Sequence, residues 1–260
     1  MHPTDLYLER IEGLLQTRRF GRSLEIREST DSTNDDARNA AQAGAVAGHV
    51  VVADTQRQGR GARGRSWSSP AGSDLYLSIV TQSSLPLQDV APLTLAVGLG
   101  VAETVQAFLP AGRVAKIKWP NDVWIDRKKV AGILLESASF GPTTPPVIVG
   151  IGLNVNRLVF PDGLDTPPTS LALEGGQTLD RAAVLATLLA RVEHWFDSFV
   201  RDGTEQVVAA LNARLCLRGE LARCDDVQGV VEGVAPSGAL RMSVDGQLRE
   251  LYAGTLRPLG

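Results

Sequence analysis

The spacing of apolar residues along the chain predicts five helices. In most of these segments apolar side chains recur every three or four positions, which places them on one side of a helix. We expect the second helix to end before Gly44, and Asp180 to cap the fourth. The segments are 6–15, 33–43, 90–108, 181–199 and 204–215. In the third, small residues indicate close packing on a sheet: Ala96, Gly98, Gly100 and Ala102.

Short β-rich runs alternate with the helices over the first 156 residues and predict strands. The run 75–80 is apolar enough to be buried on both faces of a sheet. Gly132, inside another run, marks a place where a ligand or another backbone comes close. The runs are 24–27, 50–53, 75–80, 115–119, 123–125, 129–136 and 147–156, and a loop is expected at 142–146.

The chain changes character after Cys216, where glycines punctuate short β-rich runs at 229–234, 239–244 and 249–252. Turn dipeptides, Ser237-Gly238 and Asp245-Gly246, separate these runs. Short, evenly spaced strands predict a small separate β-barrel of about 45 residues.

Composition and charge narrow the function. The chain has 260 residues, 43% of them hydrophobic, and its net charge of −3 gives no general attraction to nucleic acid. Cys216 and Cys224 are expected to be free thiols of a cytoplasmic protein, and the charged first 20 residues form neither a signal peptide nor a membrane span. His2, His49 and His194 lack metal-ligand spacing, and no hydrolase elbow or Walker loop is present.

Residues 56–67, here called the basic loop, hold four arginines, three glycines and no acidic residue. Glycine permits mobile loop conformations, and the arginine guanidinium binds carboxylate or phosphate groups in a bidentate manner. The loop ends in Trp67, so it is suited to close over an anion attached to a flat ring, such as a nucleotide. A solvated surface loop is the alternative. Because ordering glycines is costly, we expect the loop to be mobile until a ligand supplies counter-charge.

Two further stretches carry candidate chemistry. Ser32 and Thr33 can cap the helix that follows them, but capping does not explain Asn34, whose amide can match the edge of a cyclic urea. In the strand at 115–119, Lys116 and Lys118 share one face. The alternative for Lys118 is an ordinary exposed lysine.

Taken together, five stretches resemble biotin protein ligases, in the order seen in that family. The resemblance covers roughly residue 24 to the end, and the segment 229–259 is similar to the family's small SH3-like domain. The matching stretches are Ser32-Thr33-Asn34, the basic loop, Lys118-Trp119-Pro120-Asn121-Asp122, Lys129-Val130-Ala131-Gly132-Ile133-Leu134 and Gly150-Ile151-Gly152-Leu153-Asn154.

The resemblance implies an α/β (α+β) protein. A mixed-sheet catalytic domain related to class II aminoacyl-tRNA synthetases (24–214) would follow an N-terminal extension (1–23) and precede an SH3-like β-barrel (215–260). The implied reaction uses ATP with Mg²⁺ to convert biotin into biotinyl-5′-adenylate. It then transfers biotin to a lysine of a biotin carboxyl carrier protein domain. No protein metal site, DNA or membrane is expected, and a homodimer is left open.

The resemblance also implies residue roles. Lys118 and Arg60 would be catalytic by holding the reacting carboxylate and phosphate. The implied biotin-binding residues are Ser32, Thr33, Asn34, Gln56, Arg60, Gly61, Ala62 and Lys118. The implied ATP- or adenylate-binding residues are Arg63, Arg65, Trp67, Lys129 and Asn154.

The chain departs from the family pattern at two places. The family loop usually has a basic residue where this chain has Ala62, so we expect weaker retention of the adenylate. The segment before Leu24 is too short for the DNA-binding domain of many bacterial relatives, so a repressor role is expected to be absent. Two other functions remain open: a biotin- or nucleotide-sensing regulator without turnover, and a lipoate or octanoate ligase on the same core.

Overall fold

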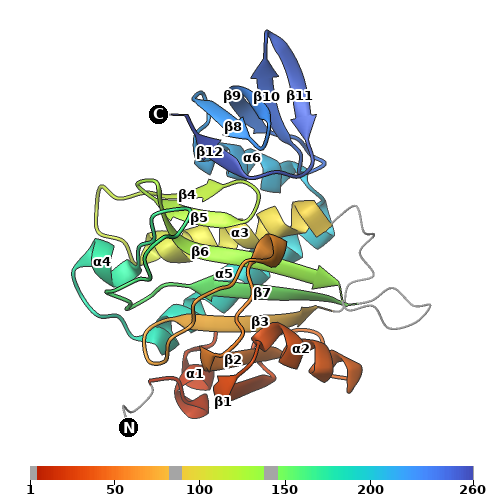
Figure 1. Cartoon of the computed structure of the whole chain (residues 1–260). Coiled ribbons are helices and arrows are strands. Elements are labelled where there is room, and N and C mark those ends of the chain that lie inside the picture. The colour runs from red at the N-terminus through yellow and green to blue at the C-terminus, as the bar shows by residue number, and fades with distance from the viewer. Residues whose placement is uncertain (1–4, 82–89, 138–145, 260) are drawn as a thin grey trace.

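The protein is built on two β-sheets (Figure 1). The structure, a computed structural model, describes residues 5–81, 90–137 and 146–259, so the loop expected at 142–146 lies almost entirely outside the described residues. A seven-stranded sheet forms the middle of the molecule, and a five-stranded sheet of C-terminal residues lies at one end of it.

The larger sheet is mixed and has the strand order β1-β2-β3-β7-β6-β5-β4. The first two strands are parallel and all other neighbours are antiparallel. All seven strands expected in this region are present, although several ends differ by a few residues. They are β1 (Leu24–Thr30), β2 (Val50–Gln56), β3 (Leu75–Thr81), β4 (Ala115–Lys118), β5 (Asp122–Ile125), β6 (Lys128–Ser137) and β7 (Val147–Leu153).

The five expected helices are confirmed, and the structure adds a short one, α4 (Leu171–Gly175). The Ser170 hydroxyl caps α4 by accepting from the amide of Leu173, and Gly176 ends it with φ of 70°. The other helices are α1 (Leu8–Leu14), α2 (Thr33–Gln42), α3 (Val90–Ala107), α5 (Arg181–Asp202) and α6 (Glu205–Arg214), and a 3₁₀ turn, η1 (Ala62–Gly64), lies in the basic loop. Among the described residues, no helix combines the length and apolar content that spanning a bilayer requires.

Alternation along the strands gives the larger sheet two different faces. Val50, Val52 and Ile79 belong to the main core beneath α3 and α5, which lie behind the sheet in Figure 1. Val51 lies between two of these residues and joins a separate apolar cluster beneath α2, on the opposite face. Strand β3 is buried at every position, as its apolar run predicts, because both of its faces are covered.

The small residues of α3 serve two contacts rather than one. An ideal Cβ on Gly98 would lie 3.9 Å from Ile133 of the sheet, which is ordinary contact. A Cβ on Gly100 would lie 2.7 Å from the Cα of Val192, so the closest approach is to helix α5 rather than to the sheet. The expected sheet packing therefore holds for Gly98, whereas Gly100 makes room for a neighbouring helix backbone.

The C-terminal sheet is antiparallel, with the order β11-β10-β9-β8-β12. Three of its strands correspond to the β-rich runs, and two shorter ones were not expected. The five are β8 (Leu221–Cys224), β9 (Val227–Val234), β10 (Leu240–Val244), β11 (Gln247–Leu251) and β12 (Leu256–Pro258). The Trp119 indole donates to the Gly238 carbonyl at 2.9 Å and joins this sheet to the larger one. Cys216 and Cys224 are both free thiols and buried.

Gly100→Ala is expected to lower the free energy of unfolding by about 1–3 kcal/mol, because the methyl group overlaps the backbone of α5. Gly98→Ala, in the same helix, is expected to leave stability unchanged or raise it by up to about 1 kcal/mol, since alanine favours helices. Urea unfolding of the two variants measures both effects. Equal shifts would contradict the assignment of the close approach to Gly100.

Candidate functional site

The site is built on a row of residues in register across the larger sheet, on the face that carries α2. Lys118 of β4 pairs with Asp122 of β5, which pairs with Gly132 of β6, which pairs with Gly152 of β7. Residues directly opposite each other on neighbouring strands point to the same side of a sheet. The row therefore runs from a lysine and a carboxylate to two positions without side chains.

Trp67 fills the room that these glycines leave. Ideal Cβ atoms on Gly132 and Gly152 would overlap its indole ring, with the Gly132 Cβ at 2.9 Å. The Trp67 amide donates to the Gly59 carbonyl at 2.7 Å, which joins the two ends of the basic loop. Lys129 Nζ lies 5.1 Å from the ring centroid, within cation–π range. The close approach expected at Gly132 is thus made by a side chain of the basic loop.

Two lysines share one buried carboxylate. Asp122 is 3% exposed, with Lys118 Nζ 3.6 Å from one of its oxygens and Lys129 Nζ 2.7 Å from the other. Lys118 is itself only 4% exposed, so the alternative of an ordinary exposed lysine is wrong. Burial lowers the pKa of Lys118 below its usual value, Asp122 raises it, and the charge of Lys129 lowers it further.

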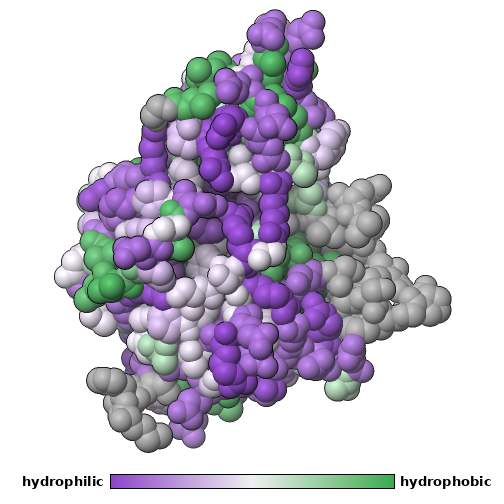
Figure 2. All heavy atoms as spheres, viewed as in Figure 1, coloured by the Kyte–Doolittle hydropathy of each residue, from purple (hydrophilic) through white to green (hydrophobic). Residues whose placement is uncertain are grey.

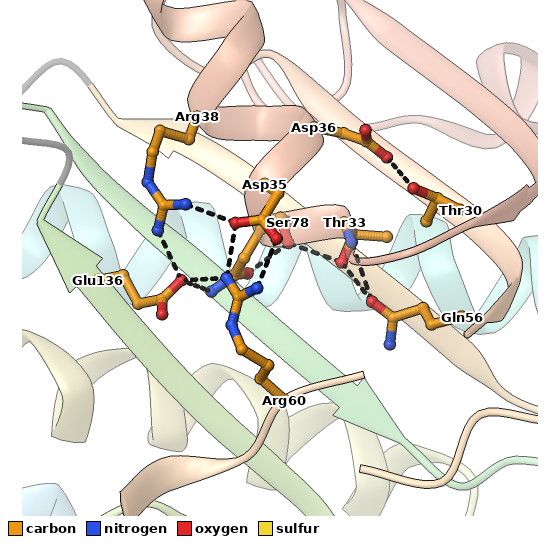
Figure 3. Close-up of polar contacts among 10 residues, drawn as sticks. Thr30, Thr33, Asp35, Asp36, Arg38, Gln56, Arg60, Ser78 and Glu136 are labelled. Carbon is orange, nitrogen blue, oxygen red and sulfur yellow. Dashed lines mark hydrogen bonds and ion pairs between the residues drawn. The ribbon is translucent and has the colours of Figure 1, made fainter. Parts of the chain in front are cut away.

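A row of hydrogen bonds connects the first two residues of α2 with the sheet (Figure 3). Gln56 Oε1 accepts from the Thr33 amide at 2.9 Å. The Thr33 and Ser78 hydroxyls lie 2.8 Å apart, and Ser78 donates to Asn34 Oδ1 at 2.6 Å. Asn34 Nδ2 donates to Glu136 Oε2 at 2.7 Å. Every member of this row is thereby held in one orientation.

Beside this row, four charged side chains form a closed ring of alternating sign (Figure 3). Arg60 of the basic loop donates to both oxygens of Asp35, at 2.5 and 2.8 Å, and to Glu136 at 3.0 Å. Arg38 pairs with the same two carboxylates. Hydrogen bonding from Arg60 is the largest cause of the lowered pKa of Asp35. Arg60 is therefore paired with two carboxylates in this structure, and its side chain is 36% exposed.

Two cavities meet beneath the basic loop. The larger has a volume of about 420 Å³ and lies between the loop, the start of α2 and strands β6 and β7. The smaller, of about 200 Å³, lies between the loop, β4 and the C-terminal sheet. Ala62, Arg65 and Asn121 line both. Figure 2 shows hydrophilic residues gathered over the middle of this face of the molecule.

The structure brings most of the expected site residues together. The larger cavity is lined by Ser32, Thr33, Asn34, Gln56, Arg60, Gly61, Ala62, Arg65, Trp67, Lys129 and Asn154. Lys118 lines the smaller cavity instead. Arg63 points to the C-terminal sheet, where its Nη1 donates to Thr255 Oγ1 at 2.7 Å. Ser32 occupies the N-cap position of α2 but makes no capping hydrogen bond with its side chain.

Several polar residues of the site were not expected from the sequence. Ser78 and Glu136 interrupt apolar strand runs, and that interruption is the signal that could have marked them. Asp122 lies inside a matching motif but was assigned no function. Asp35 and Arg38 look like ordinary helix residues, so only their contacts identify them. The described residues contain no cluster of three or more His, Cys, Asp or Glu side chains suited to a metal ion.

Comparisons with known proteins agree on one family. The model of the Biotin/lipoate A/B protein ligase family matches residues 26–154. The biotin–[acetyl-CoA-carboxylase] ligase of Mycobacterium tuberculosis is 34% identical and covers 90% of this chain and 88% of its own length. The enzyme of the same name from Paracoccus denitrificans is 37% identical and covers 81% and 90%. The Aquifex aeolicus biotin protein ligase in complex with biotin and ATP superposes with a TM-score of 0.79 at 26% identity, covering 91% and 98%.

Gly152→Ala is expected to push Trp67 off the sheet, because the added methyl group would occupy the place of the indole. The displaced loop should be cut by trypsin about tenfold faster, since such an overlap costs about 1–3 kcal/mol. Gly175→Ala is the control, because its Cβ would lie 4.0 Å from the nearest atom. Mass spectrometry of the loop fragments measures the rates, and equal rates for both variants would contradict the contact.

Proposed function

Since the chain belongs to the biotin/lipoate A/B protein ligase family, we infer that it is a biotin–protein ligase. It activates biotin with ATP and transfers the biotin to a carboxyl carrier protein. The observation that carries this conclusion is the buried Lys118 ammonium beside the paired cavities. The cavities lie in a fold shared with the Aquifex aeolicus ligase, whose structure contains biotin and ATP.

The first step joins two anions, and this is the problem that the site must solve. A biotin carboxylate oxygen attacks the α-phosphorus of ATP, the bond from that phosphorus to the bridging oxygen breaks, and pyrophosphate leaves. The reactants repel each other unless fixed positive charge lies at the point of contact. We assign this charge to Lys118, whose position is fixed by burial and by Asp122.

The second step transfers the acyl group. The neutral ε-amine of an acceptor lysine attacks the acyl carbon of the adenylate, an amide bond forms, the amine loses its proton, and AMP leaves. The acceptor lysine is expected to belong to a biotin carboxyl carrier domain. The adenylate must stay bound until the carrier arrives, and we propose that the basic loop retains it. Ala62 offers no charge where both cavities meet, which supports weaker retention.

The larger cavity divides into two regions with different chemistry. We assign the ring of biotin to the region of Ser32, Thr33, Asn34 and Gln56, where fixed amides and hydroxyls can match a cyclic urea. We assign the adenylate to the opposite region. There Trp67 offers a flat surface, and Arg65, Lys129 and Asn154 lie near it.

Arg60 needs a change of partners to reach a phosphate. Its guanidinium is held by Asp35 and Glu136, so a substrate anion would have to compete with two carboxylates. The proposed catalytic role of Arg60 therefore includes movement of the basic loop. Arg63 is proposed to act indirectly, because its contact with Thr255 ties the loop to the C-terminal sheet.

Several finer assignments belong to the same proposal. The larger sheet would be related to class II aminoacyl-tRNA synthetase cores, and the C-terminal sheet would be an SH3-like barrel. We expect Mg²⁺ to be held mainly by the triphosphate oxygens, because magnesium commonly binds through substrate phosphates with few protein carboxylates. Asp122 is the buried carboxylate nearest to Lys118 and the candidate for such a contact. A cytoplasmic location and a homodimer stay predictions.

Lys118→Gln is expected to reduce biotin-dependent exchange between ATP and pyrophosphate by about 100-fold or more, because it removes a preorganised charge from the reacting centre. Lys116→Gln is the matched control, since that lysine lies on the same strand but is exposed. If the unmodified protein catalysed exchange between ATP and pyrophosphate with lipoate but not with biotin, it would be a lipoate ligase instead. Full activity of Lys118→Gln would refute the proposed chemistry.

We expect the loss of activity at alkaline pH to follow the deprotonation of Lys118. Its charged form is needed, so kcat/KM for biotin is expected to fall as pH rises through its lowered pKa. Asp122→Asn removes the carboxylate that raises this pKa and should move the loss of activity to lower pH. Lys129→Gln removes a charge that lowers it and should move the loss of activity to higher pH. Shifts of the same sign in the two variants would contradict the assignment.

A further inference from the structure

We propose that Glu136 is a positioning residue that couples the ring-binding part of the larger cavity to the basic loop. One of its oxygens, Oε2, accepts from Asn34 Nδ2 at 2.7 Å and from Arg60 Nη2 at 3.0 Å. Arg38 Nη2 donates to the same oxygen at 3.0 Å. The proposal rests on the proposed function, because it concerns how that substrate site is arranged.

The carboxylate sets the direction of the whole hydrogen-bond row. It can only accept, so the Asn34 amide must turn its NH₂ group toward Glu136 and its oxygen toward Ser78. The Ser78 hydroxyl must then use its single hydrogen for Asn34 Oδ1, because that amide oxygen can only accept. The charge of Glu136 therefore fixes the donor and acceptor roles of Asn34 and of the Ser78 hydroxyl.

Asn34 is held against the sheet, so its amide cannot turn. Gly150 of β7 has no Cβ, and an added Cβ would overlap the Asn34 side-chain oxygen. Asn34 therefore lies directly on the sheet, and it is only 5% exposed. A buried amide in such a place cannot exchange its two ends without leaving a polar group unpaired. The pattern of donors that a cyclic urea would meet thus follows from the charge of Glu136.

The same oxygen holds the basic loop closed. Arg60 is the loop residue in the charged ring, where it forms ion pairs with Asp35 and Glu136. With two arginines and two carboxylates the ring is neutral, so neutralising Glu136 leaves one unbalanced positive charge. Such charge-assisted bonds are about twice as strong as neutral ones. Losing the charge of Glu136 should therefore release the loop. The same loss should leave the Asn34 amide without a fixed orientation.

The test compares Glu136→Gln with Asp36→Asn. Both variants replace one carboxylate by an amide of the same shape, but Asp36 bonds Thr30 and Arg27 and lies outside the charged ring. In substrate-free protein, trypsin should cut the basic loop about tenfold faster in Glu136→Gln than in the unmodified chain, with Asp36→Asn unchanged. The KM for biotin in the exchange assay should rise about tenfold in Glu136→Gln, with a smaller change in the KM for ATP.

A third variant tests the sign of the effect. Arg38→Gln removes the cation that competes with Arg60 for the two carboxylates, so loop cleavage should become slower. Unchanged cleavage in Glu136→Gln, or faster cleavage in Arg38→Gln, would overturn the proposal whatever the substrate is. Absence of biotin-dependent exchange in the unmodified chain would instead refute the proposed function and leave the cleavage result standing. Thermal melts confirm that each variant is folded, and Arg38→Gln keeps the proposal testable if Glu136→Gln does not fold.

Discussion

The site depends on the close approach of side chains to one face of a β-sheet. Gly132, Gly150 and Gly152 leave a strip of backbone uncovered at the centre of this face. Trp67 and Asn34 lie on that strip, so an aromatic ring from a loop and an amide from a helix reach positions that a Cβ would occupy. Placing the smallest residues at the middle of the sheet thus determines where the other groups can lie.

The site's charges follow from a second constraint, the cost of burying cations. Each lysine or arginine near the centre lies beside a carboxylate: Asp122 faces Lys118 and Lys129, while Asp35 and Glu136 face Arg60. Burying a charge without a partner is costly, and this pairing compensates for it. An anionic substrate would compete with these carboxylates for the lysines and arginines. Binding would therefore replace an internal carboxylate by a substrate anion beside each cation.

The sequence predicts much of this arrangement, for identifiable reasons. Apolar spacing gives five helices and the strands of the larger sheet because burial imposes periods of 3.6 and 2 on the side chains. Contacts between distant segments are not encoded in any local period. Asn34 and Glu136 are 102 positions apart, and nothing near either residue indicates the other. Helix α4 was missed because its five residues are too few to show a period. Lys118 was located by motif, but its burial depends on the neighbouring loop and sheet.

Hydrogen bonds to the C-terminal part of the chain flank Lys118 on both sides. The carbonyl of Ile117, the residue before it, accepts from the Cys216 amide at 2.8 Å, and the indole of Trp119, the residue after it, donates to Gly238. Lys118 thus lies between two residues that are hydrogen-bonded to the C-terminal part of the chain. A C-terminal part exchanged with that of a relative would therefore have to supply the same two hydrogen bonds to keep Lys118 in its place.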